Sequence, residues 1–483
     1  MKLYIDSTKL KLERIETVVQ LRKKNRNEMI DKIRNIDSTF DDNGEIDMAV
    51  TSNASLSPEL IKGLWNPDIN VVKRKVFMLR KLLCVENPPI EDAINANILP
   101  RLNELLNCDM EEIRFHIAWI LTNIACGFDE HIGAIVNSNC LDSLIKILKS
   151  QQDSQRVLKQ TVWTLSNIAG ENVRYRNLLI NYDIITSLIS LVDKTTTHID
   201  VKIQAIWCLS NMCRRKDSPT PIKEIKQILN LAAKLIYSDN EHILRNSLWI
   251  LAYICDGPCE RMTLVLESGI LDRLIEIVLH PNQELINPAL RTIGNILAGS
   301  EKQTQLAIDA SVLPVLINIA GAKHISKFIR KEAFWALSNI AAGNPSQIKQ
   351  LIDDGGLKVV KSVFEEDNMQ LQKEGLWSLC NMLGNAEGTY DIAESIVSQG
   401  LLECMIRLLK KNDFKIVDKT LDCLYKIFNL GEEKQPNFFT YAFEELDGMD
   451  VLFELQYKQS DVLFKKSQRI IINFFHSDDD TSD

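Results

Sequence analysis

At 483 residues the chain is several times longer than a usual domain, so it either divides into domains or repeats a smaller unit. Its 45% hydrophobic and 25% charged residues are typical of a folded soluble protein, and no apolar run approaches the roughly 20 residues that span a bilayer. The eleven cysteines and seven histidines show no metal-ligand spacing, and no phosphate-binding or nucleophile motif is present. We therefore expect no enzyme, no cofactor, no metal site and no membrane partner.

The first predicted element is a basic arm at residues 1–36. Residues 1–34 hold ten lysines and arginines against five acids, so the net charge of −9 leaves −14 on the rest of the chain. Opposite charges on arm and body predict two electrostatic partners, and the acidic body argues against nucleic acid as a ligand. The stretch ETVVQLRKKNRNEMIDKIRN at 16–35 fits a basic amphipathic helix that docks on an acidic partner, or a solvated helix without one. The N-terminus has no apolar signal core, so we expect no secretion.

A polar linker is predicted at 37–55, and two sequence markers recur in the body at 56–475. Variants of WTLSNIAG (163–170) place an aromatic residue or its replacement, in steps of 42 or 44, at Trp119, Trp163, Trp207, Trp249, Arg291, Trp335 and Trp377. A second marker opens an amphipathic segment, in steps of 42 to 45, at Leu99, Leu141, Ile185, Leu229, Leu271, Leu313, Leu357 and Leu402. Two independent markers with one period predict an all-α solenoid of about ten repeats of armadillo or HEAT length.

Each repeat is predicted to contain one helix that begins at the second marker and another that carries the W-x-x-x-N segment. A glycine closes the latter helix in a position that favours a left-handed cap, at Gly127, Gly170, Gly257, Gly299, Gly343 and Gly384. After the last repeat, an acidic tail at 476–483 is predicted to be disordered.

The W-x-x-x-N spacing puts each tryptophan beside its asparagine on one helix face, so stacked repeats line both residues into columns. Tryptophan at helical spacing is commonly core, but asparagine fits a buried helix interface badly because its amide needs partners. We therefore expect the columns to face a groove in which amides bind an extended peptide's backbone and indoles hold lysine or arginine stems. Glu171, Glu332 and Glu374 would supply the opposite charge.

The columns are interrupted in the middle, where Tyr253 replaces an asparagine and Arg291 replaces a tryptophan. A fixed cation at 291 would repel a basic peptide, so the groove is predicted to have two separate basic-peptide sites. Three repeat steps separate Trp207 from Trp335, which is on the order of 30 Å or nine to ten extended residues. A ligand with two basic clusters at that spacing would bind both sites at once.

With these features the sequence resembles the importin alpha family of armadillo nuclear-import adaptors, over nearly the whole chain. The family also tends to have W-x-x-x-Y in its fifth repeat and R-x-x-x-N in its sixth. The resemblance implies a right-handed superhelix with a major and a minor site for nuclear localisation signals. The implied major site consists of Trp119, Asn123, Gln160, Trp163, Asn167, Glu171, Trp207 and Asn211, with Arg214 beside it. The implied minor site consists of Gly299, Thr304, Glu332, Trp335, Asn339, Glu374, Trp377 and Asn381.

Three residues near the implied major site depart from the family pattern. Glu171 replaces an aspartate, Ile132 replaces a threonine that lines the lysine pocket, and Asn246 replaces an acid three residues before the fifth tryptophan. These departures predict that the minor site is relatively more important here than is usual in the family.

The arm resembles the family's importin-beta-binding segment through Leu21, Arg22, Lys23, Arg26, Lys32 and Arg34. The resemblance implies importin beta, cargo with mono- or bipartite basic signals, and an exportin-class factor at the last repeat as partners, with shuttling between cytoplasm and nucleus. The alternative is a catenin-like armadillo scaffold, although a scaffold for acidic partners would want a basic groove.

Overall fold

The computed structural model describes residues 56–85, 87–214, 218–384, 389–457 and 460–475, and within these ranges the chain forms helices and no strand. The chain divides after Gly257 into two compact units, an N-terminal unit whose described residues are 56–257 and a C-terminal unit that begins at Pro258. The predicted arm, linker and acidic tail lie outside the described residues, and so do all six predicted importin-beta-binding residues.

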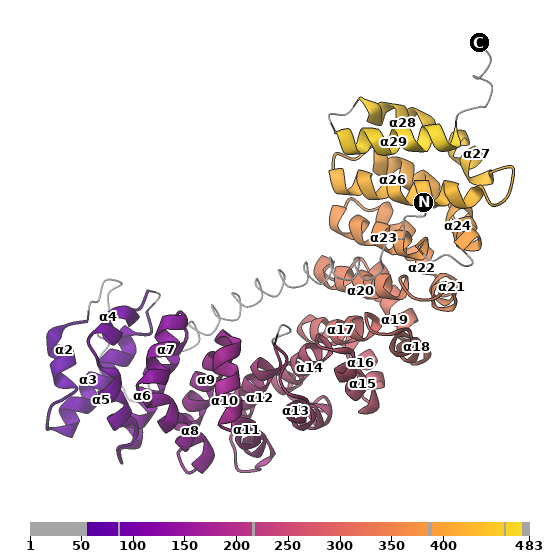
Figure 1. Cartoon of the computed structure of the whole chain (residues 1–483). Helices are drawn as coiled ribbons and strands as arrows, with labels where there is room; N and C mark the ends of the chain where they lie inside the picture. The colour runs from indigo at the N-terminus through magenta and orange to yellow at the C-terminus, as the bar shows by residue number, and fades with distance from the viewer. Residues whose placement is uncertain (1–55, 86, 215–217, 385–388, 458–459, 476–483) are drawn as a thin grey trace. The chain divides into compact units, whose positions relative to one another are not determined.

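In each unit the longest helices of successive repeats stack side by side, as Figure 1 shows. We call these the third helices, because most repeats place two shorter helices before them. Asn240, Asn282 and Ser326 cap three of them by accepting hydrogen bonds from backbone N–H groups of the first turn. In the N-terminal unit they are α3 (Ile69–Leu82), α6 (Glu111–Ala125), α9 (Gln155–Glu171), α12 (Ile199–Cys213) and α14 (Glu241–Cys255). In the C-terminal unit they are α17 (Gln283–Leu297), α20 (Lys327–Ile340), α23 (Met369–Met382), α26 (Phe414–Gly431) and α29 (Asp461–Phe474).

Within each unit the second helices form a parallel layer, in which each packs on the third helix of its own repeat and on the neighbouring second helices of the same unit. They are α5 (Leu99–Leu106), α8 (Cys140–Ser150), α11 (Ile184–Asp193), α13 (Ile222–Leu235), α16 (Leu271–Val278), α19 (Val312–Gly321), α22 (Gly356–Phe364), α25 (Leu401–Leu409) and α28 (Gly448–Gln456). Seven of the eight second-marker residues occupy the first or second position of such a helix, as predicted. Leu229 instead lies midway along α13, because this repeat has no separate first helix in its described residues.

The remaining helices are short and precede the second helices. The first repeat has α2 (Pro58–Gly63), which packs on α3. Later repeats have α4 (Ile90–Asn95), α7 (Asp129–Asn137), α10 (Val173–Asn181), α15 (Cys259–Glu267), α18 (Glu301–Asp309), α21 (Pro345–Asp353), α24 (Thr389–Ser398) and α27 (Phe438–Glu445). Together the described helices make ten repeats, which confirms the predicted all-α repeat fold.

The predicted left-handed caps at the closing glycines are wrong, because none of those six glycines has a positive φ. Positive φ values occur instead just before the second helices, where the chain turns sharply, for example at Asn139 (φ 61°) and Gly355 (φ 101°). The closing glycines serve a different purpose. A Cβ at Gly299 or Gly343 would lie 2.2 Å from the Oε1 atom of Gln303 or Gln347.

The side chains of Gln303 and Gln347 turn back toward the N-termini of their own helices, α18 and α21, which are the first helices of the following repeats. Gln303 Oε1 accepts from the Ser300 backbone N–H at 2.9 Å, and Gln347 Oε1 accepts from the Asn344 N–H at 3.3 Å. The side chain that caps the next helix therefore occupies the space that a Cβ would need. Glycine is required at these positions by close packing and not by backbone conformation.

No single helix in the described part of the chain is long and apolar enough to cross a membrane. One pair of helices, α18 with α19, has the length and composition of a membrane span, but the pair is bent by 82°. No disulfide joins any of the eleven cysteines.

Candidate peptide-binding face

The six tryptophans of the first marker, five with an asparagine and Trp249 with Tyr253 four residues later, all lie at the same register of a third helix, and all six are half-buried. Residues on the opposite side of the same helices form the core, such as Leu165 and Ile168 of α9, whose side chains are fully buried. The indoles therefore belong to the surface of the third-helix layer. We call Trp119, Trp163 and Trp207, with Asn123, Asn167 and Asn211, the N-terminal row. We call Trp335 and Trp377, with Asn339 and Asn381, the C-terminal row.

The asparagines sit deeper than the indoles. Asn123 and Asn167 are half-buried, whereas Asn211, Asn339 and Asn381 are only 5%, 4% and 6% exposed. In four repeats the amide Nδ2 donates to a backbone carbonyl of the preceding third helix. Its acceptors are Thr122 at 3.3 Å for Asn167, Ser166 at 3.0 Å for Asn211, Gly294 at 3.0 Å for Asn339 and Ser338 at 2.7 Å for Asn381.

The acceptor is always the residue just before the preceding repeat's own asparagine. A helical carbonyl has a second lone pair that the helix leaves unused, so this bond satisfies the amide without breaking the helix. The premise that asparagine lacks a partner between packed helices was therefore wrong. Asn211, Asn339 and Asn381 each donate one amide N–H to the preceding repeat, whereas Asn167 also donates to the Cys126 Sγ at 3.1 Å. The carbonyl oxygen of Asn381 has no hydrogen-bond partner among the described residues.

The interruption between the rows is stabilised by internal contacts. Tyr253 stacks on Trp249 with ring centroids 5.5 Å apart and planes 28° apart. Arg291, on α17, is 3% exposed; its Nε lies 2.8 Å from Glu332 Oε2, and its guanidinium lies over the Trp335 ring at 5.8 Å. Glu332, which the sequence predicts as an acid for a ligand's cation, is therefore already paired within the chain.

The other predicted site residues lie around the two rows. Glu171 ends α9, Glu374 is half-buried on α23, and Gly299 follows α17. Two are buried in polar contacts. The Gln160 Oε1 atom accepts from the Thr122 hydroxyl at 3.3 Å, and the Thr304 hydroxyl donates to the Leu297 carbonyl at 3.1 Å. Gln160 and Thr304 are therefore buried beneath the peptide-binding face and bond to other residues of the chain.

The departures from the family pattern have clear structural consequences. Ile132, on α7, is fully buried, so its side chain offers nothing to a peptide. Asn246 is 4% exposed and donates to the Ile203 carbonyl at 3.3 Å. Position 132 therefore supplies no polar group for a lysine, and position 246 supplies no acidic one.

The sequence reasoning missed two cations that lie over the outermost indoles. The guanidinium of Arg80, on α3, lies 4.4 Å from the centre of the Trp119 ring. The ammonium of Lys419, on α26, lies 4.4 Å from the centre of the Trp377 ring. A basic residue about one repeat away from a tryptophan is the signal that would have pointed to them.

Comparisons with known proteins identify the class of repeat protein to which the chain belongs. Models of the armadillo/beta-catenin-like repeat match residues 86–126, 128–170 and 300–342, which correspond to the helix triplets α4–α6, α7–α9 and α18–α20. The crystal structure of an engineered protein is similar in fold, with a TM-score of 0.73 at 24% identity over 87% of this chain and 98% of that one. The chain is an armadillo-repeat protein.

Proteins with similar sequences identify one family within the armadillo-repeat proteins. Importin subunit alpha-1a of Oryza sativa subsp. japonica is 30% identical over 489 residues, and importin subunit alpha-3 of Arabidopsis thaliana is 32% identical over 493. Both alignments cover 99% of this chain and 92% of the relative. The importin beta binding domain model matches residues 2–74, so it extends beyond the predicted arm as far as α3.

The chain belongs to the importin alpha family, as its sequence motifs predicted. It is accordingly a nuclear import adaptor that links cargo to importin beta through its N-terminal segment.

Proposed function

We propose that this adaptor holds basic nuclear localisation signals on the third-helix face, with the N-terminal row as the major site and the C-terminal row as the minor site. The observation that carries the proposal is the repeated placement of half-buried indoles at one register of successive third helices. Neighbouring packed helices lie roughly 8–10 Å apart, which is the rise of about two to three residues of an extended peptide. A lysine or arginine stem fits between two such indoles, with its charge over a ring face.

The asparagine carboxamides beside the indoles can form hydrogen bonds with the backbone of a bound peptide. Because one amide N–H is held by the preceding repeat, the orientation of the amide is fixed before a ligand arrives. The remaining N–H and the carbonyl oxygen can bond to a peptide of any sequence, so selectivity for basic residues comes from the indoles and the nearby acids.

We further propose that importin beta binds Leu21, Arg22, Lys23, Arg26, Lys32 and Arg34, and that an exportin-class factor docks on the last repeat. Exposed aromatic side chains on α27 and α28 support the second docking surface, with Phe438 58%, Tyr441 56% and Phe453 46% exposed. Exchange between these partners would make the protein shuttle between cytoplasm and nucleus.

Binding of a bipartite basic peptide, with and without importin beta, tests the proposal directly. We expect the full chain to capture a peptide with two lysine- and arginine-rich clusters about ten residues apart, and not an acidic peptide of equal length. We also expect the basic peptide and importin beta to be captured together. Equal capture of the acidic peptide would instead favour a general armadillo scaffold.

The relative strength of the two rows gives a second prediction. Because Ile132 offers no polar group and Asn246 no acidic group to a lysine, Asn339→Ala is expected to lower the affinity for a bipartite peptide at least as much as Asn167→Ala does. Asn339→Ala removes one inter-repeat hydrogen bond and Asn167→Ala removes two, so each variant's thermal unfolding serves as the control. A loss at Asn167→Ala that is tenfold or more greater than at Asn339→Ala would contradict the prediction.

A further inference from the structure

The C-terminal row is bounded on both sides by cations of the chain itself. Helix α20, which carries Trp335, packs between α17 and α23, and α23, which carries Trp377, packs between α20 and α26. Arg291 reaches the Trp335 ring from α17, and Lys419 reaches the Trp377 ring from α26. The two outer ring faces are therefore occupied, and the space between Trp335 and Trp377 is the inter-indole slot of this row.

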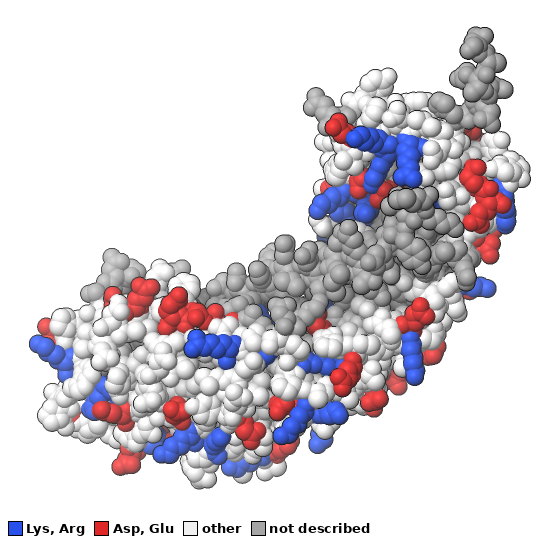
Figure 2. Space-filling view, in the orientation of Figure 1, with Lys and Arg blue, Asp and Glu red and all other residues white. Residues whose placement is uncertain are grey.

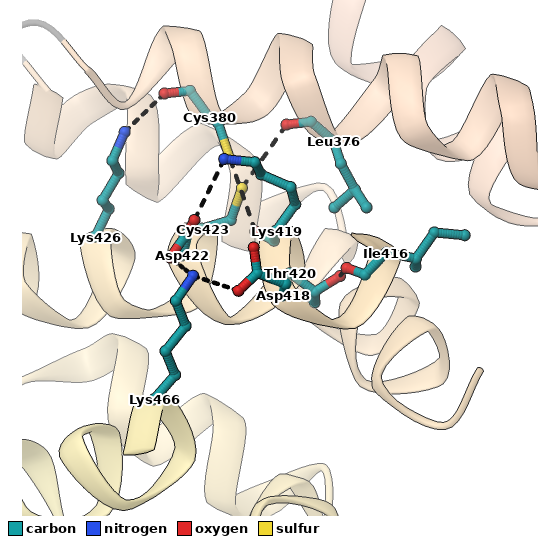
Figure 3. Close-up of polar contacts among 10 residues, drawn as sticks. All are labelled: Leu376, Cys380, Ile416, Asp418, Lys419, Thr420, Asp422, Cys423, Lys426 and Lys466. Carbon is teal, nitrogen blue, oxygen red and sulfur yellow. Dashed lines mark hydrogen bonds and ion pairs between the residues drawn. The ribbon is translucent and has the colours of Figure 1, made fainter. Parts of the chain in front are cut away.

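Lys419 is held over Trp377 by a network on α26 and α29, which Figure 3 shows in part. Its ammonium lies 3.5 Å from an Asp422 carboxylate oxygen. Asp422 also binds Lys466 at 2.6 Å, and Lys466 binds Asp418 at 2.5 Å. Burial alone would lower the pKa of Lys466, but its hydrogen bonds to the two aspartates outweigh burial and raise that pKa. Asp422 is thus shared between two ammonium groups and holds Lys419 in place.

The surface beyond Trp377 is also cationic. Figure 2 shows lysine and arginine side chains gathered over α26 and α29. On α29, Arg469 lies 4.2 Å from the centre of the Tyr425 ring and donates to its hydroxyl at 2.8 Å. Lys426 extends across to α23, where its Nζ donates to the Cys380 carbonyl at 2.9 Å. A ligand's second cation that approached the α26 side of Trp377 would meet this positive charge.

We propose that Lys419 is a specificity-determining residue of the C-terminal row: it occupies the outer face of Trp377 and limits the row to one cationic side chain in its indole slot. This inference rests on the proposed function of the row. A neutral, flexible residue at 419 would remove the repulsive charge from the outer ring face and could be displaced from it by a ligand's cation. The row would then accept a second lysine placed two residues along an extended peptide, where side chains point to the same side.

The test compares two peptides that differ by one lysine. Both are alanine-rich and of equal length; one carries a single lysine, and the other carries two lysines separated by one alanine. Binding is measured by calorimetry on the full chain with Trp163→Ala and Trp207→Ala, so that the C-terminal row dominates. Without a change at 419, we expect the second lysine to raise affinity less than twofold. With Lys419→Met, we expect the second lysine to raise affinity about fivefold, the magnitude of one cation–π contact.

Two further variants separate selectivity from structure. Lys419→Arg keeps a cation over Trp377 and should preserve the low preference for the second lysine. Lys415→Met removes the same charge from an exposed position four residues earlier on α26, and should change both affinities equally. A structural role alone would alter unfolding temperature without altering the ratio of the two affinities.

The outcomes are distinguishable. If Trp335→Ala and Trp377→Ala abolish binding while Lys419→Met leaves the affinity ratio unchanged, the inference is wrong and the proposed site stands. If binding is insensitive to Trp335→Ala and Trp377→Ala, the row is not a peptide site, and the role assigned to Lys419 falls with it.

Discussion

Simultaneous replacement of Trp163 and Trp207 by alanine is expected to weaken binding of a single-cluster lysine-rich peptide about a hundredfold in a chain whose C-terminal row is already disabled by Trp335→Ala and Trp377→Ala. Each indole forms one wall of a slot, and a cation over a partly desolvated ring contributes about 1–2 kcal/mol. Two such losses amount to about 3 kcal/mol, which corresponds to a factor of about 100 in the dissociation constant. Fluorescence anisotropy with a labelled peptide measures the change.

Trp65 provides the matched control for this experiment. It does not belong to the series of six tryptophans on the third helices, and it is 47% exposed in the first repeat. Trp65→Ala should change the peptide affinity less than twofold. If the double variant also binds within threefold of the parent chain with the disabled C-terminal row and keeps its unfolding temperature, the N-terminal row does not hold the peptide.

Glu332→Gln is expected to destabilise the C-terminal unit by about 3 kcal/mol, because it leaves the Arg291 guanidinium buried without a neutralising partner. The side chains of Arg291 and Glu332 are 3% and 4% exposed, so water cannot replace the lost charge. Glutamine has nearly the same shape, which isolates the effect of charge from that of packing. Hydrogen exchange of the α17 and α20 amides measures the local loss of stability.

An exposed ion pair in the same unit supplies the comparison. Arg407 and Glu403 are 2.5 Å apart with side chains 47% and 59% exposed, so Glu403→Gln should cost less than about 1 kcal/mol. Replacing both Arg291 and Glu332 by methionine should recover most of the stability, since neither charge is then left alone. Equal effects of Glu332→Gln and Glu403→Gln would contradict the burial argument.

The repeat architecture was accessible from the sequence because it depends on local patterns that recur. Leu99 and Leu271 begin second helices, and each W-x-x-x-N segment lies on a third helix, as their spacing predicted. The closing glycines were misinterpreted for a physical reason. The local signal was a capping box that begins directly after the glycine, with Gln303 four residues after Gly299 and Gln347 four residues after Gly343, and the glutamine side chain fills the space of a Cβ.

The candidate site was only partly accessible from the sequence. The interruption at Arg291 could be read directly, but its pairing with Glu332 depends on which helices are neighbours and how their side chains extend. The same holds for Lys419 over Trp377, since a single lysine on an amphipathic helix resembles any solvated charge. To predict which side chains meet between repeats, one must know how the helices stack, and a single sequence does not give that geometry.

The hydrogen bonds from the asparagines to the preceding helix have a consequence for how such chains diversify. Their acceptors are main-chain carbonyls, at Thr122, Ser166, Gly294 and Ser338, so the bond makes no demand on the side chain of the residue that receives it. The bond therefore tolerates substitution of the accepting residue, as the different side chains of Thr122, Ser166 and Gly294 illustrate. Neighbouring modules can change sequence at this position while the hydrogen bond is kept, which is consistent with relatives that span the whole chain at only 30–32% identity.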